Sequence, residues 1–288
     1  MILSVTLNPA LHVDYVGERV RLGAENPVSG VRHRAGGRGL TVARLLHTFG
    51  HEVTAAGLAG GSAGELLRVA LAGAGVATRF TRIGAETRRV LRVADTAEDT
   101  TTVFREPAPY ITTEELGRLA ADYRALLDGA TAVVLSGSLP AGLPPDLYGS
   151  LTSYAVGAGI PVVLDAGGPE LRYGAARGPA LVIPEPGDEA GLDIAGASAV
   201  VFVAGLGLRA LTPQGQWQAD LSACTEPAVL SRDGLVAGFV PGAALGWSWP
   251  DMLRHALALA SSVSPDGEVD LDGYELVLSG VTVAGPLT

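Results

Sequence analysis

The sequence predicts an α/β protein with a mostly parallel central sheet and a small additional β flap. Short apolar runs typical of buried strands alternate with segments of helical spacing, and two further stretches alternate like exposed strands. A chain of 288 residues that is 48% hydrophobic and 17% charged can bury a large core. Because no repeat, linker or low-complexity segment divides it, we expect a single domain over 1–288.

Six apolar runs are the expected strands of the main sheet, since each is short and followed by a turn or a helix start. They lie at 2–7, 53–59, 132–137, 161–166, 180–185 and 199–205. Segments at 38–50, 112–129 and 144–159 have apolar residues at helical spacing. The second opens with Thr112 three residues before Glu115, a capping box, and the third opens with proline, which a first helical turn accepts.

Two stretches interrupt this alternation and predict the flap. Residues within about 12–34 and 88–106 alternate apolar and polar side chains and contain turns, as exposed strands do. We expect them to pair as a small β lid over one edge of the main domain.

The charge balance argues against large anionic partners. Thirty acidic residues against twenty basic ones give a formal net charge of −10, so neither nucleic acid nor a membrane surface is an expected partner. The chain has no lysine, so arginine must supply its permanent cationic contacts. The single Cys224 cannot form an internal disulfide, no apolar run reaches membrane-spanning length, and the first residues lack a signal-peptide pattern. We therefore expect a cytoplasmic protein.

Ligands of open α/β sheets bind beyond the carboxyl ends of the strands, and small or acidic residues stand there in this chain. No P-loop is present, and the Gly-Leu-Gly at 205–207 leads into an expected hairpin instead of a helix. The glycine pair before the helix at 38–50 either lets backbone N–H groups approach an anion or a sugar hydroxyl, or only forms a tight loop.

The order of the motifs resembles the PfkB, or ribokinase-like, sugar kinases, most closely the branch of 1-phosphofructokinase and tagatose-6-phosphate kinase. The matching segments span nearly the whole chain and are TLNPAL (6–11), AGGRGLTVAR (35–44), ETR (86–88), EPAP (106–109), SGSLPAG (136–142), VVLDAGG (162–168) and RDGLVAGF (232–239). The resemblance implies a ribokinase-like three-layer sandwich with a mostly parallel central sheet and a small β lid. It also implies transfer of the ATP γ-phosphoryl group, with Mg²⁺, to a hydroxyl of a sugar phosphate.

The resemblance assigns the catalytic base to Asp233, at the start of a helix whose amides form an anion hole. A carboxylate within reach of the hydroxyl supplies the proton acceptor for phosphoryl transfer. The residues alone leave an alternative, in which Ser231 caps the helix and Asp233 complements its dipole. Leu230, Ser231 and Arg232 stand where the family has Gly-Ala-Gly, so the side chains of Ser231 and Arg232 either obstruct a triphosphate or, for Arg232, contact a phosphate as part of the catalytic site.

A second set of residues matches the sugar-phosphate side of the family site. Arg38 stands where the family has lysine, Thr41 where it has asparagine, and His12 where it has a sugar-binding aspartate. A carboxylate accepts from two hydroxyls whereas neutral imidazole has one donor and one acceptor, so His12 should change which sugar fits. Asp14 either stands in for that aspartate or belongs to the lid strand. The predicted substrate-binding residues are His12, Asp14, Gly37, Arg38, Gly39, Thr41, Arg88 and Ser138.

The nucleotide side departs further from the family pattern. The family's Lys-Pro-Asn run and the glutamate after it match Ile183, Pro184, Glu185 and Asp188, and no serine or threonine precedes the glycines at 205–207. Glu185 and Asp188 either hold magnesium through water or form a solvated acidic helix start. The predicted nucleotide-binding residues are Ser231, Gly205, Gly207 and Glu185, and the predicted metal residues are Asp165, Glu185 and Asp188.

Two functions therefore stand at this point. One is an ATP-dependent carbohydrate kinase of the 1-phosphofructokinase type, which rests on the retained Asp233 and the overall match. The other is a pseudokinase, a sugar-phosphate-binding or regulatory protein that has lost productive ATP binding, which rests on the altered nucleotide motifs. By the same resemblance we expect a homodimer formed through the lid.

Overall fold

The computed structural model describes residues 1–188, 196–221 and 229–287, and Cys224 lies outside them. Its main sheet has ten strands within the described residues, in the order β14-β13-β12-β11-β10-β9-β8-β1-β4-β5. The strands from β5 to β11 run parallel, and β12, β13 and β14 are antiparallel to their neighbours. Their bounds are β1 Ile2–Thr6, β4 Val53–Ala59, β5 Ala77–Arg82, β8 Ala132–Ser136, β9 Val162–Ala166, β10 Leu181–Pro184, β11 Val200–Ala204, β12 Gly207–Thr212, β13 Gly215–Leu221 and β14 Val281–Leu287.

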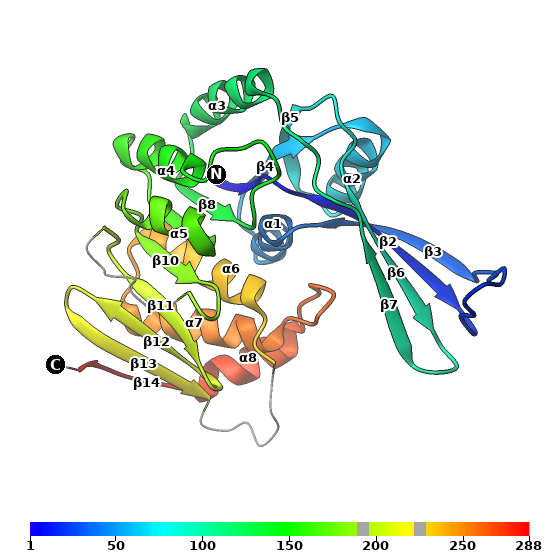
Figure 1. Ribbon diagram of the computed structural model, residues 1–288. Helices are drawn as coiled ribbons and strands as arrows, with labels where there is room; N and C mark the ends of the chain where they lie inside the picture. The colour runs from blue at the N-terminus through cyan, green and yellow to red at the C-terminus, as the bar shows by residue number, and fades with distance from the viewer. Residues whose placement is uncertain (189–195, 222–228, 288) are drawn as a thin grey trace.

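Helices cover both faces of this sheet, which makes three layers (Figure 1). One apolar core joins the sheet to α1, α2, α6, α7 and α8, and the other joins it to α3, α4 and α5. The helix bounds are α1 Arg38–Thr48, α2 Gly61–Gly73, α3 Thr113–Leu127, α4 Leu147–Gly157, α5 Gly168–Ala175, α6 Arg232–Leu245, α7 Trp249–Ser262 and α8 Leu271–Gly280. No described helix is both long and apolar enough to cross a membrane.

A separate four-stranded sheet projects from one side of the body (Figure 1). It consists of β2 (Ala10–Gly17), β3 (Gly30–Gly36), β6 (Arg89–Asp95) and β7 (Thr100–Arg105), in the order β3-β2-β6-β7. Leu11 and Val13 on β2 pack with Ala63 of α2, which attaches the base of this sheet to the body. We call it the lid.

The predicted fold class is confirmed, because buried apolar runs form the parallel strands and alternating stretches form the lid. The capping box is also present, since the Thr112 hydroxyl accepts from Glu115 N–H and the Glu115 carboxylate accepts from Thr112 N–H. The third predicted helix starts later than expected: α4 begins at Leu147, so the two prolines before it lie outside its first turn. The hairpin after 205–207 is present as β12 and β13.

Candidate active site

A cavity of about 790 Å³ lies where the lid meets the body, at the carboxyl ends of β1 and β8. The start of α1, the start of α6 and the segment between α7 and α8 also line it. Six arginines line the cavity, against the carboxylates of Glu185, Asp233 and Asp266. An excess of fixed positive charge in an otherwise acidic chain favours an anionic ligand at this place.

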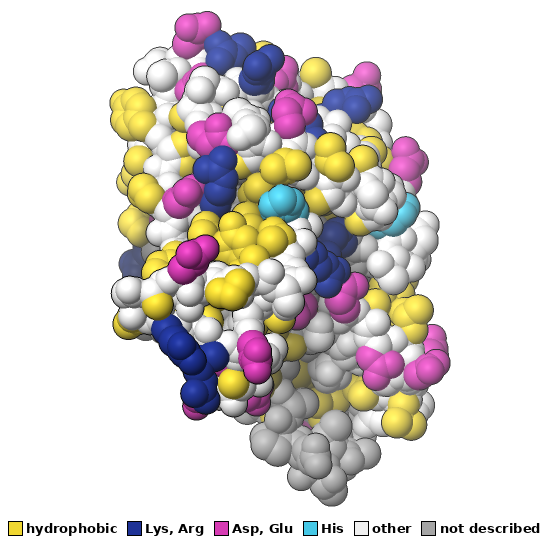
Figure 2. Space-filling view, turned by 90° about the vertical axis from the view of Figure 1, so that its right-hand side faces the viewer, with side chains coloured by type: hydrophobic (Ala, Val, Ile, Leu, Met, Phe, Trp, Pro, Cys, Tyr) yellow, Lys and Arg dark blue, Asp and Glu magenta, His cyan; other side chains and the backbone are white. Residues whose placement is uncertain are grey.

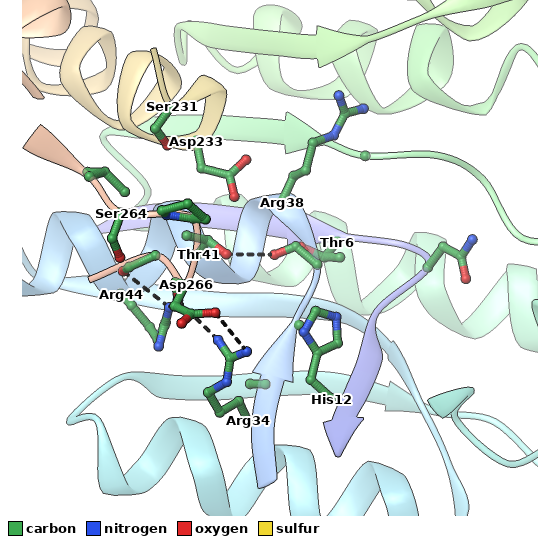
Figure 3. A pocket seen from close by; sticks show the side chains of 18 of the residues that line it. Thr6, His12, Arg34, Arg38, Thr41, Arg44, Ser231, Asp233, Ser264 and Asp266 are labelled. Atoms are coloured by element: carbon green, nitrogen blue, oxygen red, sulfur yellow. Dashed lines mark hydrogen bonds and ion pairs between the residues drawn. The ribbon is translucent and has the colours of Figure 1, made fainter. Parts of the chain in front are cut away.

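Asp233 enters the cavity from the first turn of α6 (Figure 3). The helix begins here because the Ser231 hydroxyl accepts from Gly234 N–H at 3.2 Å, as an N-cap does. Burial, and next the nearby carboxylate of Asp165, raise the pKa of Asp233 to about 6. A hydrogen bond with Thr41 and the charges of two arginines oppose that rise. A carboxylate with a pKa near 6 is mostly ionised at neutral pH and well matched to accept a proton.

Arg38 and Thr41 come from the first turns of α1, which starts after Gly37. Gly37 has φ of +127°, a conformation that L side chains rarely adopt, so the turn into this helix depends on glycine. Arg38 Nη2 lies 2.7 Å from Glu185 Oε1. Burial works against its charge, but Asp165 and Glu185 outweigh burial and raise the pKa of Arg38. Arg38 is therefore a cation held between carboxylates at the rim of the cavity.

Arg88 is positioned by Asn8, which follows β1. Arg88 Nε donates to Asn8 Oδ1 at 2.9 Å and Nη2 to the Asn8 carbonyl at 3.2 Å, while Asn8 Nδ2 donates to Ser138 Oγ at 3.2 Å. Burial and the nearby charge of Arg105 lower the pKa of Arg88. Within the described residues neither arginine forms an ion pair with a carboxylate. Two adjacent guanidinium groups without an acidic partner are what a phosphate site requires.

His12 lines the cavity from the lid strand β2 and lies against Gly36 of β3. A Cβ added at Gly36 would lie only 2.3 Å from two atoms of the imidazole ring, so the glycine makes room for it. Burial first, and the charge of Arg34 next, lower the pKa of His12 to about 4. The ring is therefore neutral at physiological pH and offers one donor and one acceptor.

Asp14 does not line this cavity. Its Oδ2 accepts from Arg34 Nε at 2.6 Å, and its Oδ1 lies 3.8 Å from Arg92 Nε. The same two arginines reach Asp266 of the segment between α7 and α8, with Arg92 Nη1 at 2.6 Å from Asp266 Oδ1. Asp14 thus belongs to an ion-pair network that ties the lid to the body.

Asp165 does not fit the predicted role of metal ligand. It is fully buried, and both of its carboxylate oxygens are occupied. Arg232 Nε donates to Oδ1 at 2.6 Å, and Ser136 Oγ donates to Oδ2 at 2.5 Å. No group of three or more His, Cys, Asp or Glu side chains that could hold a metal ion is found among the described residues. Arg38 Nε also lies 3.5 Å from Asp165 Oδ2, so two guanidinium groups and a hydroxyl already surround this buried carboxylate and compensate its charge.

Glu185 and Asp188 fit a magnesium ion better than Asp165 does. Both carboxylates approach Gly167, where an added Cβ would lie 2.6 Å from Glu185 Oε2 and 2.8 Å from Asp188 Oδ2. Asp188 Oδ2 accepts from Gly168 N–H at 2.8 Å, and Glu185 lines the cavity. A neighbouring pair of carboxylates suits Mg²⁺, which proteins usually hold through one or two carboxylates together with phosphates and water.

The remaining predicted residues lie outside the cavity lining. Gly39 is buried in the first turn of α1, where an added Cβ would lie 2.4 Å from Thr6 Oγ1. Gly205 and Gly207 form the turn into β12, with Gly205 at a φ of +62°. The guanidinium of Arg232 also points away from the cavity, toward the ends of β9 and β10.

Several lining residues were not predicted. Asn8 lies inside a quoted motif, yet its role as the bridge between Arg88 and Ser138 depends on a contact across 80 residues. Arg105 ends the lid strand β7 directly after Val103 and Phe104, with no distinctive pattern around it. Thr6 carries a buried hydroxyl with no hydrogen-bond partner among the described residues, a signal visible only in three dimensions. The lining residues that sequence reasoning did not predict include Thr6, Asn8, Arg34, Arg92, Arg105 and Asp266.

An α/β body and a β lid enclose an arginine-rich cavity with a carboxylate at a helix start, an arrangement suited to a small anionic ligand. The model of the pfkB family of carbohydrate kinases matches residues 12–186, more than half of the chain. The chain therefore belongs to the PfkB family and is a carbohydrate kinase. The matched range ends before Asp233.

Two solved structures illustrate the similarity of the fold. A possible 1-phosphofructokinase of Thermotoga maritima is 23% identical, with a TM-score of 0.82 and coverage of 99% of each chain. The tetrameric inhibited form of phosphofructokinase-2 of Escherichia coli is 24% identical, with a TM-score of 0.84 and coverage of 96% of this chain and 98% of its own. At these identities the comparison establishes the ribokinase-like fold over nearly the whole chain.

Proposed function

We propose that this kinase transfers the γ-phosphoryl group of ATP to a hydroxyl of a sugar phosphate, as a 1-phosphofructokinase does. The observation that carries the proposal is Asp233, an ionisable carboxylate at a helix start that faces the cavity and has a pKa of about 6. The arginine pair of Arg88 and Arg105 supports a substrate that already bears a phosphate. We place the enzyme in the cytoplasm, where ATP and sugar phosphates are available.

In the proposed reaction, Asp233 accepts the proton of the attacking hydroxyl while that oxygen forms a bond to the γ-phosphorus and the bond to the leaving oxygen of ADP breaks. The start of α6 contributes a positive helix terminus next to the transferred group. Arg38 adds a fixed guanidinium at the same rim of the cavity. Phosphoryl transfer depends mainly on positioning and charge stabilisation, which these groups provide.

The nucleotide would arrive with magnesium, and Glu185 and Asp188 are the residues that would hold the ion. When bound, the ion neutralises charge on the nucleotide phosphates. Glu185 Oε1 also forms an ion pair with Arg38, the first residue of α1. This ion pair connects the proposed magnesium-binding carboxylates to the start of that helix.

The sugar would lie between the lid and the body. The neutral His12 ring, Thr41 and Ser138 line this part of the cavity and offer hydroxyl and imidazole groups to the sugar. Gly37 allows the backbone to turn into α1 close to the proposed sugar position. His12 stands where the family has an aspartate that binds the sugar. The preferred sugar should therefore differ from that of the family at the pair of hydroxyls that the aspartate would bind.

The test is a coupled turnover assay with magnesium-ATP and fructose 1-phosphate, fructose 6-phosphate, tagatose 6-phosphate and free fructose, together with calorimetric binding of each. Turnover of a phosphorylated sugar that falls by about 10²- to 10⁴-fold in Asp233→Asn supports the proposal. The rate should also fall as the pH drops through about 6, since protonated Asp233 cannot accept a proton. Binding of a sugar phosphate without any turnover would overturn it and favour a pseudokinase, an alternative that the family match does not support.

We also propose that two chains associate through their lids. Val31 and Phe104 are exposed on one face of the lid, and Val16 and Val103 on the other. Apolar side chains gather on the face seen in Figure 2. Burial of such side chains in a dimer interface would remove apolar area from water. Sedimentation of the wild type as a monomer at micromolar concentration would refute this association.

A further inference from the structure

Arg232, the first residue of α6, sends its side chain back toward the sheet. Its Nε donates to Asp165 Oδ1 at 2.6 Å, its Nη1 to the Pro184 carbonyl at 2.7 Å, and its Nη2 to the Ile183 carbonyl at 2.7 Å. All three guanidinium nitrogens are therefore engaged at the carboxyl ends of β9 and β10. In this arrangement the side chain cannot contact a phosphate in the cavity.

The three acceptors form an oxygen cage around the guanidinium. One is a fully buried carboxylate oxygen, which needs a cationic or hydrogen-bonding partner to remain ionised. The other two are carbonyl oxygens of β10, the last strand residues before the chain turns away. A carboxylate with two carbonyls is also the kind of oxygen set that binds a hard metal cation. The planar guanidinium fork satisfies all three at once, which an ammonium group cannot do with the same geometry.

The same side chain fixes the start of α6. Ser231 N–H donates to the Ala260 carbonyl at 2.7 Å, which holds the residue before the helix to α7. Arg232 holds the first helical residue to the sheet from the other side. Asp233 follows directly, so its position over the cavity depends on both attachments.

We propose that Arg232 is a positioning residue that acts as a built-in cation: it fills the oxygen cage at the ends of β9 and β10, and thereby holds Asp233 in place. A metal ion at Asp165 is unnecessary because the guanidinium of Arg232 at Oδ1, with that of Arg38 at 3.5 Å from Oδ2, already compensates the carboxylate. The catalytic consequence rests on the proposed function, in which Asp233 is the base. The occupation of the cage does not, so it can be tested separately.

The test compares Arg232→Met, Arg232→Lys and Arg232→Gly with the wild type. The matched control is Arg254→Met, which removes an arginine from α7 whose carboxylate partner is solvent-exposed. We expect Arg232→Met to lower kcat by about 10- to 100-fold with little change in the KM values for ATP and sugar phosphate, because the base is misplaced and the ligand contacts remain. We expect Arg232→Lys to recover part of the rate and the control to keep all of it.

Arg232→Gly allows chemical rescue. Low-millimolar guanidinium chloride should raise both its kcat and its melting temperature, whereas the same concentration lowers or leaves unchanged the melting temperature of the wild type and the control. Urea, which has a similar shape and no charge, should not rescue. The melting-temperature measurement needs no turnover, so it tests the cage even if the proposed kinase reaction fails.

Three results would overturn the proposal. The first is an Arg232→Met variant whose kcat and melting temperature equal those of the wild type. The second is an increase in KM for ATP at unchanged kcat, which would make Arg232 a phosphate ligand. The third is a folded Arg232→Gly variant that guanidinium neither stabilises nor reactivates. If Arg232→Gly does not fold in buffer, folding that appears only when guanidinium is present supports the proposal, and failure with guanidinium present counts against it.

Discussion

Replacing Asp233 by asparagine should make the folded protein more stable as it removes the proposed proton acceptor. Burial and Asp165 raise the pKa of Asp233 from 3.8 to about 6, so its ionised form is disfavoured in the folded chain. Each tenfold change in proton affinity is worth about 1.4 kcal/mol, so ionised Asp233 costs the wild type about 3 kcal/mol of folding free energy above pH 6. Asparagine has nearly the same shape and carries no charge, so it avoids this cost.

The sign of the pH dependence follows from the direction of the shift. Between 3.8 and about 6 the folded state holds the Asp233 proton more tightly than the unfolded state does. The wild type therefore loses stability as the pH rises through this window, relative to Asp233→Asn. The gain of the variant should be near zero below pH 4 and reach its full value above pH 7.

The assay is urea unfolding of both proteins without ligands, followed by circular dichroism, at intervals from pH 4 to pH 8. Asp128→Asn is the control, because Asp128 is exposed at the end of α3 and should change the free energy of unfolding by less than about 0.5 kcal/mol at every pH. A variant that is less stable than the wild type at pH 8, or a gain that does not vary with pH, would refute the assignment of a raised pKa to Asp233.

Three further substitutions address the ligand sites. Gly36→Ala should weaken sugar binding by about 10- to 100-fold in calorimetry and leave ATP binding unchanged, since the new Cβ displaces the ring of His12; unchanged sugar affinity would exclude His12 as a sugar contact. Arg88→Met should raise the KM for a phosphorylated sugar by about 10- to 100-fold and reduce the preference over the free sugar, because a charged hydrogen bond is lost; an unchanged preference would place the phosphate elsewhere. Asp188→Asn should raise the Mg²⁺ concentration needed for half-maximal turnover, and an unaltered requirement would remove Asp188 from the metal site.

The main sheet was predictable because its strands carry local signals. Runs such as 132–137 and 161–166 begin with three or four consecutive apolar residues and reach a polar residue, Ser136 or Asp165, only near the strand end, as strands buried on both faces do. The lid was predictable for the opposite reason, since its strands have one face toward solvent or ligand and therefore alternate. The predicted start of α4 was too early, because proline is accepted both in the first turn of a helix and just before it.

The site was only partly predictable, because its geometry depends on contacts between distant segments. Asn8 orients Arg88 across 80 residues, and Asp266 reaches Arg34 across 232 residues. Neither pairing has a signature in the neighbouring sequence. A short motif fixes which side chains stand at a strand end, while the partner that completes their hydrogen bonds comes from a loop elsewhere in the chain.

Arg232 shows the limit most clearly. Its place beside Asp233 suggested either an obstruction or a phosphate contact, since both follow from a long cation at a helix start. The side chain instead turns toward Asp165, because a buried carboxylate and two strand-end carbonyls offer it three strong acceptors at once. A buried cation is tolerated only where several well-placed acceptors offset its desolvation, and tertiary packing decides where such acceptors lie. If Asp233 is the base, as we propose, an arginine at the position before it reinforces the site by holding the start of α6 to the sheet.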